Sequence, residues 1–139
     1  MRTAKDVGDR LREAGIRVTT PRIAVYDYLL THRTHPTCDE IYTGIKVKNP
    51  DLSLASVYNV TEKLVENELI IRIVSPDGER HYDAMTDFHA HFFCNDCGKI
   101  FDVDCEGKED LIQLQGAVID SVAVSAYGRC PFCAVKSRD

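Results

Sequence analysis

Four cysteines in two closely spaced pairs carry the clearest chemical signal in this sequence. Cys94 and Cys97 are separated by two residues, and Cys130 and Cys133 repeat that spacing further along the chain. Four thiolates are what a closed, tetrahedral zinc site requires, so the pairs predict one structural zinc ion. The alternative is two disulfide bonds, which are typical of exported proteins. The 32 residues from 98 to 129 exceed the spacer of a minimal zinc ribbon and predict a helix and a strand between the pairs.

A second, chemically different metal site is indicated by His89, His91 and Asp102. The two histidines are two residues apart, so on a β-strand both imidazoles leave the same face. Asp102 follows on what reads as the next strand. Imidazoles with a carboxylate form a mixed nitrogen and oxygen site that suits iron, manganese or zinc. The alternative is that His89 and His91 are ordinary surface or core residues of a strand.

The composition predicts a soluble chain of one ordinary domain or two small ones. Its 139 residues are 44% hydrophobic and 28% charged. No stretch approaches the roughly 18 consecutive apolar residues of a membrane-spanning helix. The first residues form no apolar run, so we expect no signal peptide. Thiolates kept for metal then favour a reducing cytoplasm.

The net charge of −5 is unevenly distributed. Residues 1–80 contain 12 basic and 12 acidic side chains, whereas residues 81–139 contain 5 and 10, which accounts for the whole excess. A locally basic face in the N-terminal part can therefore still meet phosphates. Net charge alone neither supports nor excludes nucleic-acid binding.

The first 83 residues predict a winged helix-turn-helix. Capping residues and hydrophobic periodicity predict four helices and a hairpin, with Thr20 capping the second helix and Gly15 ending the first. The expected helices span 4–14, 21–32, 38–48 and 54–67, and the expected strands span 69–74 and 80–83. Such a fold places one helix in the major groove of DNA. We expect that helix to be 54–67, because it directly precedes the hairpin.

The remaining residues predict a second, α/β domain. We expect a winged-helix DNA-binding domain over 1–83, a hinge over 84–88, and a dimerisation and metal-binding domain over 89–139. In the last of these, the pattern predicts strands at 90–94, 99–103 and 119–127 and a helix at 107–118. A small sheet with open edges is covered by pairing across a two-fold axis, so we expect a homodimer. The whole chain is then α+β in class.

Six residues of the N-terminal part are candidate DNA contacts. Basic side chains and a tyrosine hydroxyl suit phosphates, whereas serine and asparagine near the start of a recognition helix suit base edges. The phosphate candidates are Arg17, Arg22, Lys63 and Tyr58, and the base candidates are Ser56 and Asn59. The alternatives are that the basic residues form a solvated face and that Tyr58 is a core residue.

The order of these motifs resembles the Fur family of metal-dependent transcription repressors. The resemblance covers nearly the whole chain and rests on residues 18–22, 35–37, 53–59 and 89–102, followed by the second cysteine pair. It implies a regulatory site for Fe(II) or Mn(II) on five residues: His35, Asp83, His89, His91 and Asp102. Without the resemblance, His35 reads as a solvated loop residue and Asp83 as a turn former at a strand end.

Two features resemble the peroxide-sensing PerR branch of that family. The family position filled by Asp102 is usually Glu in iron-uptake regulators, and Tyr58-Asn59 is also more like the peroxide branch. The resemblance then implies a repressor of palindromic operator DNA that responds to peroxide when Fe(II) promotes oxidation of His35 or His89. Phe88 and Ala90 occupy positions where a further Fur-type site would need His and Asp, so we expect that site to be absent. The alternative is an iron- or zinc-uptake regulator that responds to metal level only.

Two other classes of protein compete with this interpretation. A metalloenzyme would use the histidines and carboxylates to activate water, but it leaves the winged helix unexplained. A zinc-stabilised interaction module would have no sensing role. We do not expect an enzyme, because oxidation of a ligand is a single event without turnover. The sequence assigns no role to Cys38 or Cys105, and none to His81 beyond a possible contact with a metal ligand.

Overall fold

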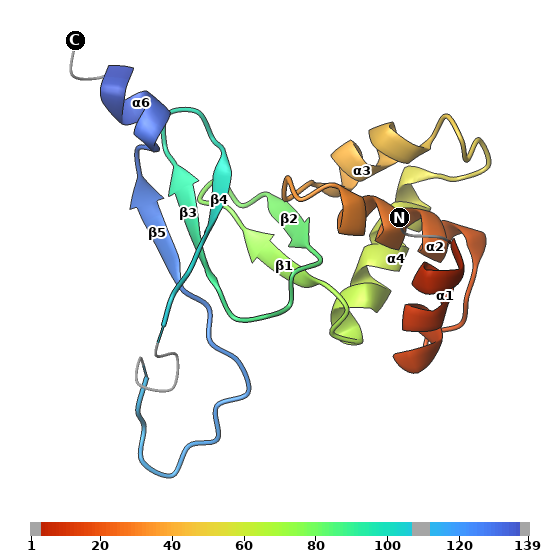
Figure 1. Cartoon of the computed structure of the whole chain (residues 1–139), viewed down its shortest axis with the longest axis horizontal. Coiled ribbons are helices and arrows are strands. Elements are labelled where there is room, and N and C mark those ends of the chain that lie inside the picture. The colour runs from red at the N-terminus through yellow and green to blue at the C-terminus, as the bar shows by residue number, and fades with distance from the viewer. Residues whose placement is uncertain (1–3, 107–111, 137–139) are drawn as a thin grey trace. The chain divides into compact units, whose positions relative to one another are not determined.

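The computed structural model describes residues 4–106 and 112–136. It divides into two compact units, Met1–Thr86 and Asp87–Asp139, each of which is described by itself (Figure 1). Within the described residues, no helix is long and apolar enough to cross a membrane.

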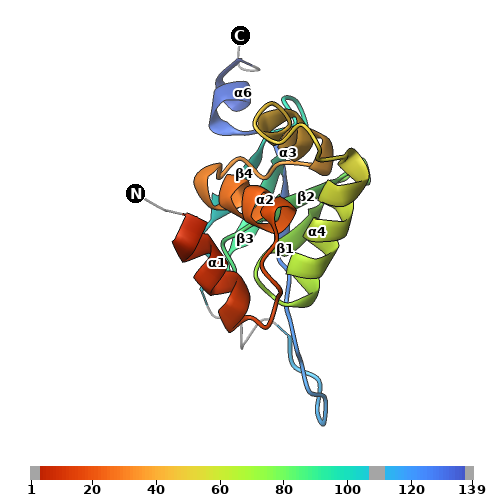
Figure 2. The same cartoon turned by 90° about the vertical axis from the view of Figure 1, so that its right-hand side faces the viewer.

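The first unit consists of four helices followed by a hairpin. The helices are α1 (Ala4–Glu13), α2 (Thr20–Thr31), α3 (Cys38–Ile45) and α4 (Leu54–Glu66). Helix α2 packs against each of the other three, and α3 also packs against α4 (Figure 2). Each helix buries its apolar stripe, as hydrophobic periodicity requires. The core includes Leu11, Val25, Ile41, Val57 and Leu64.

Local hydrogen bonds explain where these helices begin and end. At Gly15 the backbone is left-handed (φ 78°), and Ile16 N–H donates to Leu11 O, so the predicted glycine C-cap is confirmed. Thr37 forms a capping box with Glu40. The N-cap of α2 is Thr19, not Thr20 as predicted, because it is the Thr19 hydroxyl that accepts from Arg22 N–H.

The hairpin pairs β1 (Ile71–Val74) with β2 (Arg80–Asp83) in antiparallel register, so Asp83 lies opposite Ile71. Tyr82 of β2 is buried in the core formed by the helices. The helices and hairpin follow the order predicted for a winged helix-turn-helix.

The second unit is a three-stranded sheet with a short C-terminal helix. Its elements are β3 (Ala90–Cys94), β4 (Ile100–Val103), β5 (Ser125–Gly128) and α6 (Pro131–Lys136). The central β3 pairs with β4 in antiparallel and with β5 in parallel orientation. Because β4 and β5 both pair with β3, the sheet holds the two ends of the long connection between them.

That connection differs from the sequence-based expectation. Of the predicted helix 107–118, residues 107–111 lie outside the described residues, and 112–118 are not helical. The predicted strand 119–127 is also wrong over most of its length, because β5 begins only at Ser125. Residues 112–121 are exposed. A segment without a surface on which to bury its apolar residues gains too little from packing to offset the entropy of ordering a helix.

Candidate metal centres and nucleic-acid interface

The four predicted zinc ligands lie together in the second unit. Cys94 and Cys97 flank the turn after β3, whereas Cys130 directly precedes α6 and Cys133 lies in its first turn. Their four sulfur atoms all lie within 4.8 Å of one another, and Cys97 Sγ is 3.9 Å from Cys130 Sγ. Zinc–sulfur bonds of about 2.3 Å in a tetrahedron place sulfurs about 3.8 Å apart. The cluster therefore fits a four-cysteine zinc site, and none of its thiols is in a disulfide.

Backbone N–H groups prepare one of these thiols for metal binding. The N–H groups of Cys97 and Cys130 donate to Cys94 Sγ over 3.4 Å and 3.3 Å, and they lower the pKa of Cys94 to about 6. Cys133 behaves in the opposite way. Its thiol is hydrogen-bonded to Cys130, which raises the pKa of Cys133 to about 12, so this thiol keeps its proton. Zinc replaces such shared protons, because the thiolate is the ligand.

Two of the predicted regulatory ligands meet in the first unit. His35 lies in the loop between α2 and α3, and Asp83 ends β2. His35 Nε2 is 3.4 Å from Asp83 Oδ2, and both side chains are buried. The interpretation of His35 as a solvated loop residue is therefore wrong. Arg33 lies against the same carboxylate, with Nη2 3.6 Å from Asp83 Oδ1.

The other three predicted ligands meet in the second unit. His91 of β3 lies opposite Asp102 of β4, and His89 comes immediately before β3. The Nε2 atoms of His89 and His91 are 3.1 Å and 3.4 Å from Asp102 Oδ1. His89 Nδ1–H donates to Asp87 O over 2.7 Å, which leaves Nε2 to face Asp102. Both imidazoles are buried, so they are not surface residues of a strand.

The geometry of both groups fits a transition-metal ion. Metal bonds of about 2.1 Å to nitrogen and oxygen place neighbouring ligand atoms about 3.0–3.4 Å apart. The three distances of 3.1 Å, 3.4 Å and 3.4 Å lie in that range. Mixed imidazole and carboxylate donors are the set that suits Fe(II), Mn(II) or Zn(II).

Helix α4 presents the candidate base contacts on its exposed side. Ser53 caps the helix through its hydroxyl, which accepts from Ser56 N–H over 3.1 Å. Asn59 and Lys63 are exposed, whereas Ser56 is half-buried. Tyr58 is 44% exposed, so the alternative interpretation of this residue as part of the core is wrong. The opposite side of α4 is buried in the helical core.

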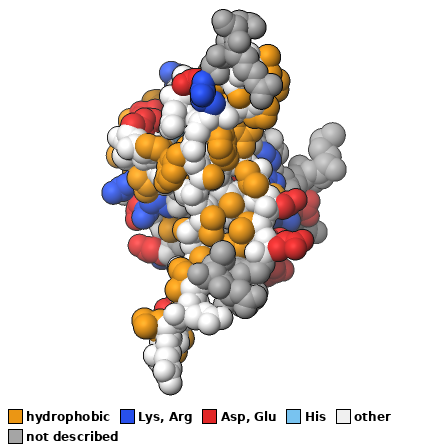
Figure 3. Space-filling model, turned by 90° about the vertical axis from the view of Figure 1, so that its left-hand side faces the viewer, with side chains coloured by type: hydrophobic (Ala, Val, Ile, Leu, Met, Phe, Trp, Pro, Cys, Tyr) orange, Lys and Arg blue, Asp and Glu red, His pale blue; other side chains and the backbone are white. Residues whose placement is uncertain are grey.

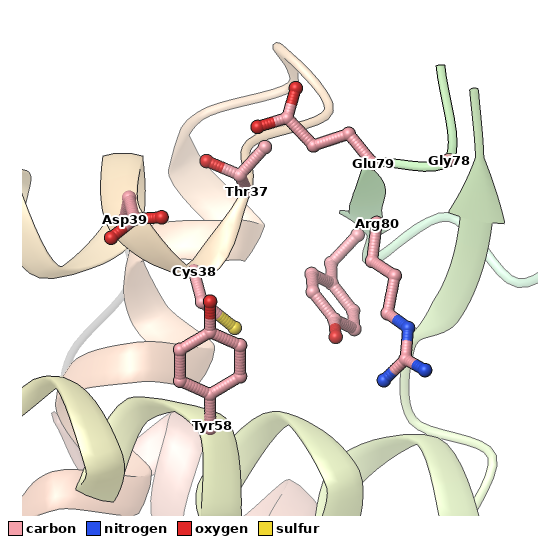
Figure 4. Close-up of a pocket in the computed structure, with 8 residues that line it drawn as sticks. Thr37, Cys38, Asp39, Tyr58, Gly78, Glu79 and Arg80 are labelled. Atoms are coloured by element: carbon pink, nitrogen blue, oxygen red, sulfur yellow. The ribbon is translucent and has the colours of Figure 1, made fainter. Parts of the chain in front are cut away.

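Tyr58 borders a pocket of about 250 Å³ within the first unit. Figure 4 shows its side chain rising from α4 toward the start of α3, with Arg80 on the hairpin side. The negative charge of Asp39 raises the pKa of Tyr58, so the hydroxyl keeps its proton and remains a donor. Arg80 is not among the DNA contacts predicted from the sequence, because a lone basic residue in a hairpin resembles a solvated one.

The remaining candidate DNA contacts lie near the start of α2. Arg17 is exposed in the loop before the helix. Arg22 is half-buried, and its Nη1 donates to Arg17 O over 2.8 Å, which ties the two together.

Cys38, which lies outside the zinc cluster, lacks the features of a reactive thiol. Cys38 is buried, and that burial raises its pKa, so the thiol stays protonated. Its sulfur lies 3.4 Å from Thr61 Oγ1. Cys105 is half-buried in the segment after β4.

Two residues near His35 were not among the site residues predicted from the sequence. Arg33 forms the ion pair with Asp83 described above, and His81 Nδ1 lies 2.8 Å from His35 O. The only available signal for His81 was its position two residues before Asp83 on a predicted strand, which places both on one face.

Comparisons with known proteins agree with this geometry. The Ferric uptake regulator family model matches residues 13–124. The Bacillus subtilis peroxide operon regulator is 33% identical over 136 residues, covering 95% of this chain and 94% of the relative. The Campylobacter jejuni peroxide stress regulator superimposes with a TM-score of 0.71 at 28% identity, over 96% of this chain and 100% of the other. The Helicobacter pylori ferric uptake regulator shares the fold (TM-score 0.77, 22% identity, 96% and 95% covered).

The helical unit with its hairpin, followed by a sheet that carries the metal-binding residues, is the arrangement of a metal-dependent regulator. The chain belongs to the Ferric uptake regulator family, which confirms the resemblance inferred from its motifs.

Proposed function

We propose that this protein is a metal-dependent, DNA-binding repressor that senses peroxide through Fe(II)-promoted oxidation of a histidine ligand. The observation that carries the proposal is the buried convergence of His89 and His91 on Asp102, in a chain 33% identical to a peroxide operon regulator. The aspartate is the residue that the peroxide branch of the family favours at this position.

Two kinds of metal have separate roles in this proposal. Zn(II) occupies the four-cysteine cluster and stabilises the second unit by neutralising thiolates that would otherwise repel one another. Fe(II) or Mn(II) is bound by His35, Asp83, His89, His91 and Asp102. The first unit contributes two of these donors and the second unit three. The family resemblance implies that one ion is held by all five, so that its loss changes the conformation that binds DNA.

The redox step balances within this ligand set. Fe(II) held by these residues would promote cleavage of the O–O bond of hydrogen peroxide. One oxygen atom is inserted into a ring C–H bond of His35 or His89, and the other leaves as water. The imidazole thus loses two electrons, the peroxide gains two, and the peptide gains the mass of one oxygen. An oxidised ring is a poorer ligand, so metal binding and DNA binding are lost together.

For DNA binding, α4 lies in the major groove with Ser56 and Asn59 toward base edges. Arg17, Arg22, Tyr58 and Lys63 contact phosphates. Two copies of the helix read the two halves of a palindromic operator, which requires a homodimer. Thiols kept for zinc are typical of a reducing compartment, which supports a cytoplasmic location.

The second unit supplies the surface for that homodimer. Eight of the eleven large hydrophobic side chains exposed among the described residues belong to this unit. Figure 3 shows hydrophobic side chains gathered on its exposed face. Tyr127, Phe132 and Val135 are among the exposed ones, at the end of β5 and in α6. Exposed apolar clusters of this kind mark surfaces that associate with a protein partner.

The test is operator selection and DNA binding under anaerobic conditions. The zinc-loaded protein is charged with Fe(II) or with Mn(II), and binding is measured before and after stoichiometric peroxide. Peptide mass spectrometry is run on the same samples. We expect binding to be lost only in the Fe(II) sample, together with one added oxygen on a peptide that contains His35 or His89.

Two controls separate the proposal from its alternatives. Mn(II) binds the same residues without promoting the oxidation, so it separates metal occupancy from peroxide chemistry. Retained binding with unmodified histidines after peroxide would contradict peroxide sensing and leave a repressor that responds to metal level. DNA binding that does not depend on Fe(II) or Mn(II) would instead support a zinc-stabilised interaction module without a sensing role.

A further inference from the structure

His81 joins the loop that carries His35 to the strand that carries Asp83. It lies in β2, and its Nδ1 lies 2.8 Å from the backbone oxygen of His35, to which it donates. The next residue repeats the connection, because Tyr82 N–H donates to Pro36 O over 3.0 Å. His81 and Asp83 are two residues apart and therefore share one face of the strand.

His35 needs such a connection because its backbone is strained. Its φ is 54°, in the left-handed region of backbone conformation that residues other than glycine seldom adopt. It lies between α2 and α3, outside any helix or strand. The residue is buried, so its carbonyl requires a protein donor in place of water. A residue held in this conformation persists only where its surroundings determine it.

We propose that His81 is a positioning residue that holds His35 in its metal-binding orientation, although it is not itself a ligand. The inference rests on the proposed function. The Nδ1–H of His81 donates to the His35 carbonyl. Strand β2 therefore positions both metal ligands of the first unit: it carries Asp83 itself, and it holds His35 through His81. The consequence is that His81 sets the affinity for the regulatory metal and the share of oxidation that falls on His35.

The first experiment measures Mn(II) affinity by calorimetry on the zinc-loaded full-length protein. Loss of the group that orients a metal ligand typically weakens binding about 10-fold to 100-fold, and we expect His81→Ala to fall in this range. His81→Asn offers an amide nitrogen close to the position of Nδ1, so it should restore most of the affinity. Thermal unfolding of each variant, recorded without Mn(II), shows whether the first unit stays folded.

A matched control comes from the same unit. His32 Nδ1 donates to Tyr28 O over 3.1 Å at the end of α2, so it makes the same kind of bond to a backbone oxygen at an exposed position. Its ring stacks on Tyr28. His32→Ala should bind Mn(II) as the unaltered protein does.

The second experiment measures where the oxygen is added. After Fe(II) loading and peroxide, mass spectrometry gives the ratio of modified His35 to modified His89. In His81→Ala the ratio should shift toward modified His89, because His35 is bound to the metal for a smaller fraction of the time. A residue with a merely structural role would change stability without changing this ratio.

The outcomes distinguish the inference from the function on which it rests. If His81→Ala binds Mn(II) and oxidises His35 like the unaltered protein, the positioning role is wrong and the proposed function stands. Equal losses in His81→Ala and His81→Asn, matched by equal losses of thermal stability, also contradict it. If the unaltered protein binds Mn(II) no more tightly than His35→Ala, the regulatory site itself is wrong.

Discussion

Replacing Arg33 by alanine is expected to tighten Mn(II) binding, because its guanidinium competes with the metal for Asp83. Arg33 Nη2 lies 3.6 Å from Asp83 Oδ1. A divalent ion that binds this carboxylate either displaces the guanidinium or remains close to its positive charge, and both cost free energy. Asp83 is buried and Arg33 is not, with side-chain exposures of 3% and 44%.

The size of the effect follows from that distance and exposure. Two unit charges 3.6 Å apart interact by about 1.2 kcal/mol at the dielectric constant of water and about 5 kcal/mol at an effective value of about 20. The exposure of Arg33 places the pair near the lower figure, and measured exposed pairs contribute up to about 1 kcal/mol. An energy of about 1 kcal/mol corresponds to a roughly five-fold change in the dissociation constant.

Calorimetric titration of the zinc-loaded protein with Mn(II) measures this change. We expect Arg33→Ala to bind about five times more tightly, and the difference to shrink between about 0.05 M and about 0.5 M salt as screening increases. Arg33→Lys keeps the charge and should resemble the unaltered protein. Arg12→Ala removes an exposed ion pair with Asp9 (2.8 Å) on α1 and controls for general loss of positive charge. Unchanged or weaker binding by Arg33→Ala, or an equal gain in Arg12→Ala, would refute the reasoning.

Three further predictions concern the zinc cluster, the helix cap and the DNA interface. Zinc affinity should rise with pH above neutrality, because the Cys133 thiol (pKa about 12) must lose a proton when zinc binds. The change in affinity per pH unit should be larger below about pH 6, where Cys94 (pKa about 6) is also protonated. Competition with a chromophoric chelator measures the affinity at each pH, and a change per pH unit that is the same above and below about pH 6 contradicts the prediction. Thr37→Ala should lower the free energy of unfolding by about 1 kcal/mol in urea titrations, because the capping box with Glu40 is lost, and an unchanged midpoint would show that the cap is redundant. Lys63→Ala should reduce the slope of log affinity against log salt by about 0.9 per protomer, and an unchanged slope would place Lys63 away from the phosphates.

The helices and the zinc cluster were predictable because their signals are local. Gly15 ends α1 and the Thr37–Glu40 box starts α3 through contacts within a few residues. Each cysteine pair is likewise defined by a short spacing, which brings both sulfurs to one turn of the chain. Patterns of this range are written directly in the sequence, and the structure follows them closely.

Predictions failed where the outcome depended on a surface that the sequence does not specify. Residues 112–118 were predicted to be helical but are exposed and not helical. The alternative that Tyr58 is a core residue is wrong for the same reason, because Val60 is buried and Tyr58 is exposed. A shift of two positions around a helix changes which residues face the core, and only the packed neighbours decide it.

By itself, the sequence determined the element order of the first unit, the set of four zinc-binding cysteines and the family, because these depend on residue types at short spacings. Tertiary structure decided the environment of each candidate ligand. It buried His35, placed Arg33 against Asp83, and brought His81 to a carbonyl 46 residues away in the chain. Contacts between residues so far apart in the chain form only when the helices and the hairpin pack into one core. No local sequence pattern predicts them.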